Sequence, residues 1–223
     1  MTFGEMVREL KGFLQDIPRQ WKGKDAILEM KNNNYNQWKQ MEWIGFYFQF
    51  LCEKYLKNVE GMRIPGPQYG RTSFDAFWNI PWDFKAHAIN TSAHQVIVND
   101  REAIEEGIKK YGKVGLILSL GEVEYNDENR SFQQWHEELK GGPSKYSLER
   151  EKRGAWSRLR KVSFSLEQIV FIEITNEILQ ECGSFQQDFR NSNGNSRKSK
   201  VLLDLESIDI GEEYCLEFKK EIS

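Results

Sequence analysis

The stretch from Ser73 to Ala88, SFDAFWNIPWDFKAHA, decides how this chain folds. It is rich in aromatic residues, which favour β-strands, while Asn79 and Pro81 near its centre favour a turn. The pattern predicts one strand over residues 73–80 and a second over residues 82–89. A chain that reverses between them pairs the two strands side by side.

Three charged residues, Asp75, Asp83 and Lys85, lie within these apolar strands. Burying a charge is unfavourable unless it is paired, so such groups need a salt bridge, a metal ion or a charged substrate. Residues two apart in a strand share a face, so Asp83, Lys85 and His87 point the same way. The chain reversal brings Asp75 near them. His87 is either a hydrogen-bonded structural residue or a contact to water or phosphate.

The two carboxylates and the lysine suit one kind of chemistry. Carboxylates brought together repel one another, and a divalent cation relieves that repulsion. A lysine beside them can stabilise negative charge on a phosphate and help to orient an attacking water. The cluster therefore predicts metal-assisted hydrolysis of a phosphodiester. A cross-strand ion pair that serves the fold alone is the other interpretation.

An acid-x-Lys tripeptide alone carries no information, because the chain contains five of them. The rival to Asp83-Phe84-Lys85 is Glu217-Phe218-Lys219, which also lies in a predicted strand. It ranks second because nothing follows it to complete a layer of structure, and its surroundings indicate solvent exposure. The paired strands around Asp83 single out the first.

Composition sets limits on the class of protein. The 223 residues are 39% hydrophobic and 29% charged, which is typical of a globular protein. No apolar run reaches the roughly 18 residues of a membrane helix, and the N-terminus lacks a signal-peptide pattern, so we expect a cytoplasmic protein without membrane contact. Three widely spaced cysteines indicate a reducing compartment and no structural zinc. The net charge of −3 gives no overall argument for nucleic acid.

The rest of the chain predicts a mixed sheet with helices on its faces. The helix 37–57 is apolar on most sides, with one polar stripe of Glu42, Gln49 and Glu53. A second helix, 99–111, has a capping box formed by Asn99 and Glu102 and a stop at Gly112. The other expected elements are a loop over 62–70, a buried strand over 114–120, a helix over 146–162, a strand over 169–174, a loop over 183–200 and a closing pair of strands within 201–219.

Positive charge is concentrated in one segment. Residues 140–161 carry eight basic and two acidic residues. On a helix, Arg150, Arg153, Arg160 and Lys161 form one basic stripe, which is the pattern expected for phosphate contacts. Arginine also reads guanine in the major groove, so part of this patch can specify sequence. A solvated charged helix is the alternative.

The order of an acidic residue, Asp-Phe-Lys on the next strand, a helix and a buried strand resembles the PD-(D/E)xK nuclease superfamily, and most of all a small type II restriction endonuclease. The resemblance covers about residues 37–120. It implies an α/β fold with a restriction-endonuclease-like core, a central mixed β-sheet flanked by helices. Carried over, Asp75 and Asp83 are the Mg²⁺ ligands, Lys85 is the catalytic lysine, and Glu42 is the helix carboxylate, with Glu53 in reserve. No proline precedes Asp75, unlike the family pattern.

The resemblance further implies sequence-specific, Mg²⁺-dependent hydrolysis of double-stranded DNA that leaves 5′-phosphates. A twofold-symmetric target implies a homodimer, and a companion DNA methyltransferase would act on the same site. We expect one nuclease domain over residues 1–223, with its catalytic core at about 37–120 and a DNA-binding elaboration at about 140–200. The residues predicted to contact DNA are Arg63, Arg71, Lys145, Arg150, Arg153, Arg158, Arg160, Lys161, Arg197 and Lys198.

Two other functions remain open from the sequence. One is a repair or recombination nuclease with the same core, which would recognise DNA structure or damage. The other is a DNA-binding module without catalysis, in which an ion pair stands where a metal site would be.

Overall fold

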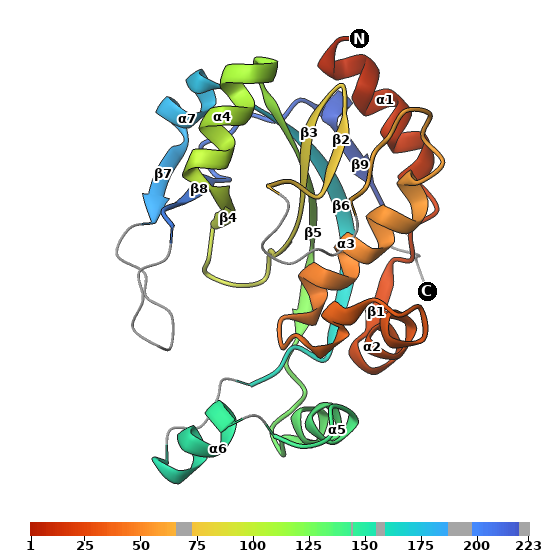
Figure 1. Cartoon of the computed structure of the whole chain (residues 1–223), viewed down its shortest axis with the longest axis vertical. Helices are drawn as coiled ribbons and strands as arrows, with labels where there is room; N and C mark the ends of the chain where they lie inside the picture. Colours follow the sequence, from red (N-terminus) through yellow and green to blue (C-terminus); the bar gives the residue numbers. More distant parts are fainter. Residues whose placement is uncertain (66–72, 144, 155–158, 187–197, 219–223) are drawn as a thin grey trace.

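The computed structural model describes residues 1–65, 73–143, 145–154, 159–186 and 198–218. They form a mixed α/β structure with a curled mixed sheet flanked by helices (Figure 1). The main sheet has the strand order β1–β6–β5–β3–β2, and β9 also pairs with β6. Its strands are β1 (Gln20–Lys22), β2 (Ala76–Trp78), β3 (Ile80–Ala88), β5 (Val114–Glu124), β6 (Ser163–Ile174) and β9 (Cys215–Glu217).

The predicted hairpin is confirmed, but its first strand is shorter than the predicted 73–80, and Ile80 and Pro81 belong to the second strand. β2 and β3 pair antiparallel, with Ala76 opposite Trp82 and Trp78 opposite Ile80. The turn between them is a single residue, Asn79, whose φ of 59° lies in the left-handed region that asparagine tolerates better than most residues. Because β2 is only three residues long, it covers only the beginning of β3. The rest of that edge of β3 is left without a strand among the described residues.

The chain then crosses to the strand on the other side of β3. Helix α4 (Arg101–Tyr111) ends at Gly112, whose φ of 81° stops the helix as predicted. β5 follows and runs parallel to β3, which confirms the predicted buried strand, although it extends to Glu124. The predicted capping box is wrong, because the side chain of Asn99 accepts a hydrogen bond from the amide of Asp100 instead.

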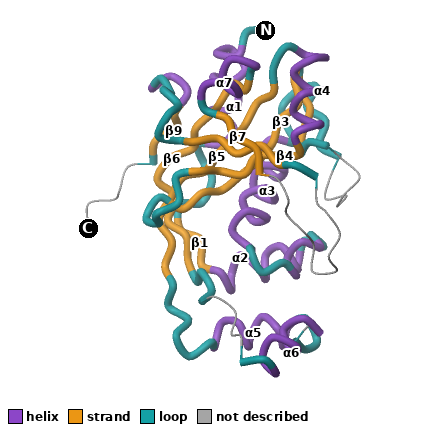
Figure 2. The backbone as a smooth tube through the Cα atoms, turned by 90° about the vertical axis from the view of Figure 1, so that its left-hand side faces the viewer, coloured by secondary structure: helices purple, strands orange, loops and turns teal. Residues whose placement is uncertain are grey.

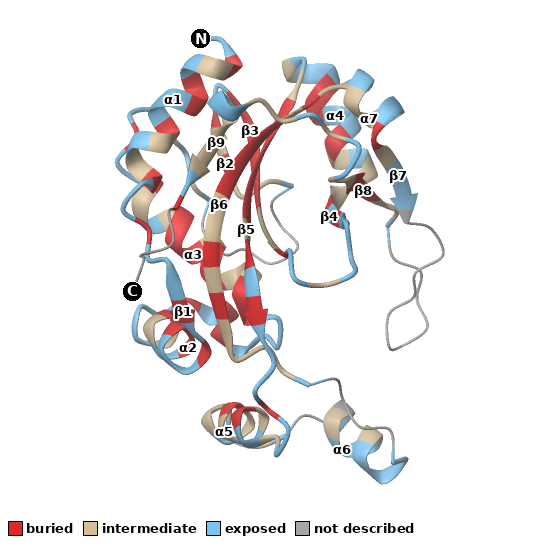
Figure 3. Cartoon of the chain, turned by 180° about the vertical axis from the view of Figure 1, so that it is seen from behind, coloured by how far each residue is buried: buried red, intermediate tan, exposed pale blue. Residues whose placement is uncertain are grey.

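Two hydrophobic clusters lie on opposite faces of the main sheet. Helices α1 (Phe3–Leu14), α2 (Gly23–Asn32) and α3 (Trp43–Leu56) cover one face, where Phe3 stacks on Trp82 at 5.6 Å. The other face packs against α4 and a second sheet of order β4–β8–β7. Figure 3 shows the buried residues following the main-sheet strands between these layers. The second sheet consists of β4 (Gln95–Asp100), β7 (Gly183–Gln186) and β8 (Lys200–Asp204), with α7 (Asn176–Glu181) beside it.

Helices α5 (Ser131–Leu139) and α6 (Lys145–Lys152) are inserted between β5 and β6. Figures 1 and 2 show them standing apart from the sheet at one end of the molecule. The buried carboxylate of Asp127 accepts the amides of Phe132 and Gln133 and so holds the start of α5. We call residues 125–162 the arm.

The predicted helix over 146–162 is wrong in its second half. α6 ends at Lys152, Gly154 has a φ of 65°, and residues 159–162 have no regular structure. Residues 155–158 lie outside the described part. A left-handed glycine ends a helix readily because it has no Cβ to clash, so the basic residues do not share one helical stripe.

Two further boundaries differ from the predictions. The helix expected over 37–57 is a 3₁₀ helix η1 (Asn36–Lys39) followed by α3, because Gln40 between them is extended. The closing strands expected within 201–219 exist but do not pair: β8 joins the second sheet and β9 joins the main sheet. The loop expected over 183–200 begins instead with β7, and residues 187–197 lie outside the described part. None of the described helices has the length and apolar character needed to cross a membrane.

Candidate active site

The uncovered edge of β3 holds the acidic residue that precedes β2. The amide of Asp75 donates to the carbonyl of Trp82 (3.0 Å), which fixes the backbone there. Its Oδ2 accepts the backbone N–H of Phe84 (2.7 Å), and its Oδ1 accepts Nε2 of Gln49 (2.9 Å). Backbone N–H groups of a strand point sideways in the plane of the sheet. The carboxylate of Asp75 therefore stands where a neighbouring strand would pair.

Asp83 and Lys85 lie on the same face of β3, as predicted from the two-residue alternation. In the pairing of β3 with β5 they stand beside Leu116 and Leu118, which belong to the cluster against α4. Asp83 is 2% exposed. The Lys85 ammonium curls back to the strand edge, where it lies 2.7 Å from Asp83 Oδ2 and donates to the carbonyl of Phe84 (3.3 Å). Asp75, Asp83 and Lys85 thus come together at one edge of β3.

Burial and charge shape the titration of this group. Burial raises the pKa of the Asp83 carboxyl above its usual range, and the nearby charge of Asp75 adds to that rise, while Lys85 opposes it. Burial works against the charged form of Lys85, but the charges of Asp83 and Asp75 outweigh it and raise the pKa of that ammonium. The lysine therefore carries its proton at neutral pH. A carboxylate of this kind gains from any additional cation that can reach it.

The residues present fit a divalent cation. Asp83 Oδ2 is buried and has no hydrogen bond recorded among the described residues, although the Lys85 ammonium lies 2.7 Å from it as an ion-pair partner. The carboxylate of Asp75 and the carbonyl of Phe84 lie at the same edge. Mg²⁺ prefers oxygen ligands, and carboxylates above all. Asp75 and Asp83 would hold the ion, with the Phe84 carbonyl beside them.

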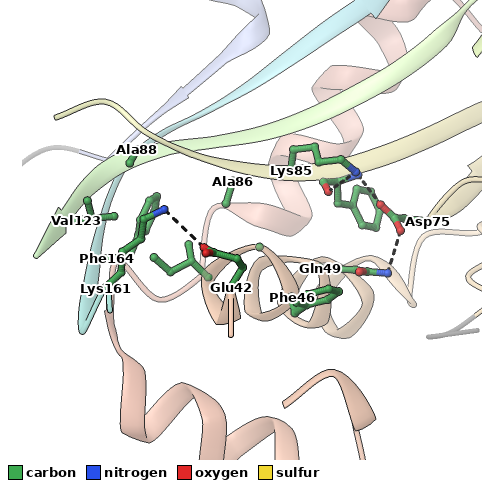
Figure 4. A pocket seen from close by; sticks show the side chains of 13 residues that line it. Glu42, Phe46, Gln49, Asp75, Lys85, Ala86, Ala88, Val123, Lys161 and Phe164 are labelled. Carbon is green, nitrogen blue, oxygen red and sulfur yellow. Dashed lines mark hydrogen bonds and ion pairs between the residues drawn. The ribbon is translucent and has the colours of Figure 1, made fainter. Parts of the chain in front are cut away.

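A cavity of about 280 Å³ opens beside this cluster, between α3 and β3. Figure 4 shows Asp75, Gln49 and Lys85 at one end of it and Glu42 and Lys161 at the other. Apolar side chains line the space between the two ends: Ile44, Phe46, Phe84, Ala86, Ala88, Val123 and Phe164. The cavity thus joins the acidic cluster to the base of the arm.

The polar stripe of α3 is divided between the two ends of the cavity. Glu42 precedes the helix, its side chain is 79% exposed, and it lies 3.8 Å from the ammonium of Lys161. Gln49, not Glu42, contacts Asp75. Glu53 lies one turn beyond Gln49, where it accepts the hydroxyl of Tyr35 (2.9 Å). Burial and then the charge of Asp75 raise the pKa of Glu53 to about 7, against the hydrogen bonds from Tyr35 and Gln49. The role of Glu42 stays a prediction.

The residues predicted to contact DNA are spread over several surfaces. Lys161 lines the cavity, and Arg160, half-buried beside it, contacts the sulfur of Met41. Arg63 stands over the Phe77 ring at 4.5 Å, beside a separate cavity of about 760 Å³. Lys198 pairs with Glu102 on α4, and Lys145, Arg150 and Arg153 belong to the arm. Arg71, Arg158 and Arg197 lie outside the described residues.

Two histidines have structural partners. His87 makes a 2.9 Å hydrogen bond through Nε2 with the carbonyl of Ala93, which joins the end of β3 to the following loop. His136 is buried in α5 and bonds the carbonyl of Trp38 (2.8 Å), which fastens the arm to η1. The rival Glu217 lies on β9 and contacts Gln168, without a second carboxylate recorded beside it among the described residues.

Sequence reasoning missed one acidic cluster and one polar contact. His94, Asp204 and Glu206 place ligand atoms within 4.8 Å of one another at the second sheet. Two of these residues are exposed and Asp204 is partly so, and no signal in the sequence joins position 94 to position 204. Gln49 lies on the predicted polar stripe, but the sequence does not predict its contact with Asp75. The seven-residue spacing of Glu42 and Gln49, two helical turns, is a sequence signal only that both lie on one side of the expected helix.

Comparisons of the chain with protein-family models, with curated proteins and with solved structures found no match.

Proposed function

We propose that this protein is a Mg²⁺-dependent DNA endonuclease of the restriction type, with Asp75 and Asp83 as cation ligands and Lys85 as the catalytic lysine. The observation that carries the proposal is the meeting of these three groups at the uncovered edge of β3. Asp75 precedes β2, whereas Asp83 and Lys85 lie on β3, and no hydrogen bond to the buried Asp83 Oδ2 is recorded among the described residues. An apolar core would not gather such groups without a use for them.

The chain's own groups divide the work at a scissile phosphodiester. Asp75 and Asp83 bind the cation, and the Phe84 amide fixes the orientation of Asp75. Lys85, protonated at neutral pH, donates to the phosphate and stabilises the negative charge that develops there. Mg²⁺, when bound, offsets the charge of the phosphate and promotes ionisation of the attacking water. Apolar walls of the cavity limit the water around the reacting group.

Double-stranded DNA is the substrate that the surrounding charge supports best. Lys85 and Lys161 stand at opposite ends of the cavity. The arm, whose base lies at the Lys161 end, carries Lys145, Arg150 and Arg153. Phosphate contacts of this kind supply affinity without regard to sequence, while arginines in a groove can read bases. Sequence specificity, a homodimer acting on a twofold target, 5′-phosphate ends and a companion methyltransferase belong to the same proposal through the family resemblance.

One observation favours a different function. Lys85 and Asp83 lie 2.7 Å apart as an ion pair, and such a pair can serve the fold alone. In that case the protein is a DNA-binding module without catalysis. A repair or recombination nuclease would use the same groups as a restriction enzyme but recognise DNA structure.

Incubating the purified protein with plasmid, in Mg²⁺ and in EDTA, separates these functions. A restriction-type enzyme gives discrete fragments in Mg²⁺ alone. A repair or recombination nuclease nicks or cuts only at branched, mismatched or damaged positions. Uncut plasmid in Mg²⁺, with binding retained in a gel-shift assay, would establish the non-catalytic module.

A further inference from the structure

The carboxylate of Asp75 is held by two donors that come from different layers of the protein. One is the backbone N–H of Phe84 in the sheet (2.7 Å to Oδ2), and the other is the side-chain amide of Gln49 on α3 (2.9 Å to Oδ1). With a single hydrogen-bond donor, an aspartate carboxylate can still rotate about its Cβ–Cγ bond. Two donors, one on each oxygen, fix the plane of the carboxylate and thus the direction of its remaining lone pairs.

A second polar contact lies one helical turn beyond Gln49, at Glu53 on α3. The Tyr35 hydroxyl donates to Glu53 Oε1 at 2.9 Å, and the Tyr35 ring is buried against Phe50 at 5.3 Å. A line of polar groups therefore runs from a buried tyrosine through α3 to the strand edge.

The chemistry of an amide suits this position better than that of a carboxylate. Asp75 and Asp83 already bring two carboxylates to the edge. An amide NH₂ group donates to Asp75 without adding charge, whereas a third carboxylate would repel the other two. The same argument assigns the nitrogen of Gln49, and not its oxygen, to the contact with Asp75.

We propose that Gln49 is a positioning residue of the nuclease site, which fixes the Asp75 carboxylate in the orientation that binds the cation. This inference rests on the proposed function. The family resemblance implies a role at the site for Glu42, but Gln49 contacts Asp75 while Glu42 lies beside Lys161.

The test compares Gln49→Met, Gln49→Glu and the control Gln180→Met, which makes the same exchange at an exposed helical glutamine. Mn²⁺ binding is measured by electron paramagnetic resonance, and plasmid cleavage gives kcat and KM. Removing a group that orients a metal ligand costs about 10- to 100-fold in metal affinity or activity. We expect that loss in Mn²⁺ affinity and kcat for Gln49→Met, with KM and melting temperature close to those of the control.

Gln49→Glu adds a readout that a purely structural residue would not change. The glutamic acid side chain can donate to Asp75 only when it is protonated. Its cleavage rate relative to the wild type should therefore rise as the pH falls from about 8 to about 6, whereas the same ratio for Gln180→Met should stay level.

The outcomes separate the two proposals. A wild-type protein that cleaves DNA and binds Mn²⁺, beside a Gln49→Met variant equal to the control, overturns the positioning role alone. A wild-type protein that neither binds Mn²⁺ nor cleaves DNA overturns the proposed function, and the positioning role falls with it.

Discussion

Two groups of acidic residues in this protein show how burial changes what neighbouring carboxylates gain from a cation. Asp75 and Asp83 meet at the edge of β3, where Asp83 is 2% exposed. His94, Asp204 and Glu206 meet at the second sheet, partly or fully exposed. The ligand atoms of the surface group lie within 4.8 Å of one another, close enough for a cation site. The two groups differ in how well water solvates their carboxylates.

At the surface, water satisfies and screens the carboxylates, and the backbone helps: Asp204 Oδ1 accepts the amide of Glu206 (3.1 Å). At the β3 edge, Asp83 Oδ2 has Lys85 beside it and accepts no hydrogen bond from the described residues. A buried oxygen that lacks a hydrogen bond gains far more from a cation than an exposed one. Closeness of ligands is therefore not sufficient for a cation site, and desolvation favours the β3 edge as the site that we propose.

Lys85→Ala should give the largest effect. Cleavage should fall below detection, because the charge that faces the phosphate is lost. Without Mg²⁺ the variant should also lose about 3 kcal/mol of folding stability, since the buried Asp83 carboxyl loses its ion-pair partner. Mg²⁺ should restore much of that stability by binding the folded state alone.

Thermal melts of the wild type and Lys85→Ala, with and without Mg²⁺, measure this, together with a plasmid digest. A variant that keeps cleaving DNA would remove Lys85 from the mechanism. A variant whose lost stability does not respond to Mg²⁺ would indicate an ion pair that serves the fold alone.

The second prediction concerns pH and the buried side of α3. The pKa of Glu53 rises from 4.5 to about 7 in the folded protein. Between pH 4.5 and about 7, Glu53 is ionised in the unfolded chain but still protonated in the folded protein. Folding stability should therefore fall as the pH rises through this range and level off above about 7. Allowing for the partial exposure of Glu53, the contribution is about 2 kcal/mol.

Urea unfolding at a series of pH values checks the second prediction. Glu53→Gln should flatten the profile between pH 4.5 and about 7 relative to the wild type. Glu206→Gln, at the exposed acidic group, is the matched control and should leave the profile unchanged. Equal slopes in the Glu53 variant and the wild type would show that Glu53 ionises normally.

The smallest effect is expected on the arm. Arg150→Ala with Arg153→Ala should weaken DNA binding and reduce the slope of log K against log salt by about one unit for each phosphate contact that is lost. Lys57→Ala with Lys109→Ala removes the same charge from exposed positions on and beside other helices. A slope as steep as that of this control would show that the two arginines do not touch phosphate.

Local patterns in the sequence were sufficient for the elements that position the site. Asn79 between two aromatic runs predicted the hairpin, because a turn residue and strand-forming neighbours act over a few positions. The two-residue alternation placed Asp83 and Lys85 on one face of β3, and Gly112 marked the end of α4. Each of these signals lies within one element or between neighbouring ones.

What the sequence could not predict depends on contacts between distant segments. β8 and β9 were expected to pair, but each finds a partner elsewhere in the chain, which no local pattern records. Helix α1 was not predicted, although Thr2 and Glu5 form the capping box that could have indicated it. The helix predicted over 146–162 is too long, because the basic pattern continues past Gly154 whereas α6 ends at Lys152. Charge on a surface constrains the backbone less than burial does.

The most direct measurement of the central claim is a calorimetric titration with Mg²⁺ of three proteins: the wild type, Asp83→Asn, and Asp204→Asn as the matched change in the exposed group. Because a neutral amide binds Mg²⁺ poorly, the account predicts one binding event in the wild type, its loss in Asp83→Asn and its retention in Asp204→Asn, with all three proteins folded. Binding that survives in Asp83→Asn, or disappears in Asp204→Asn, would contradict it.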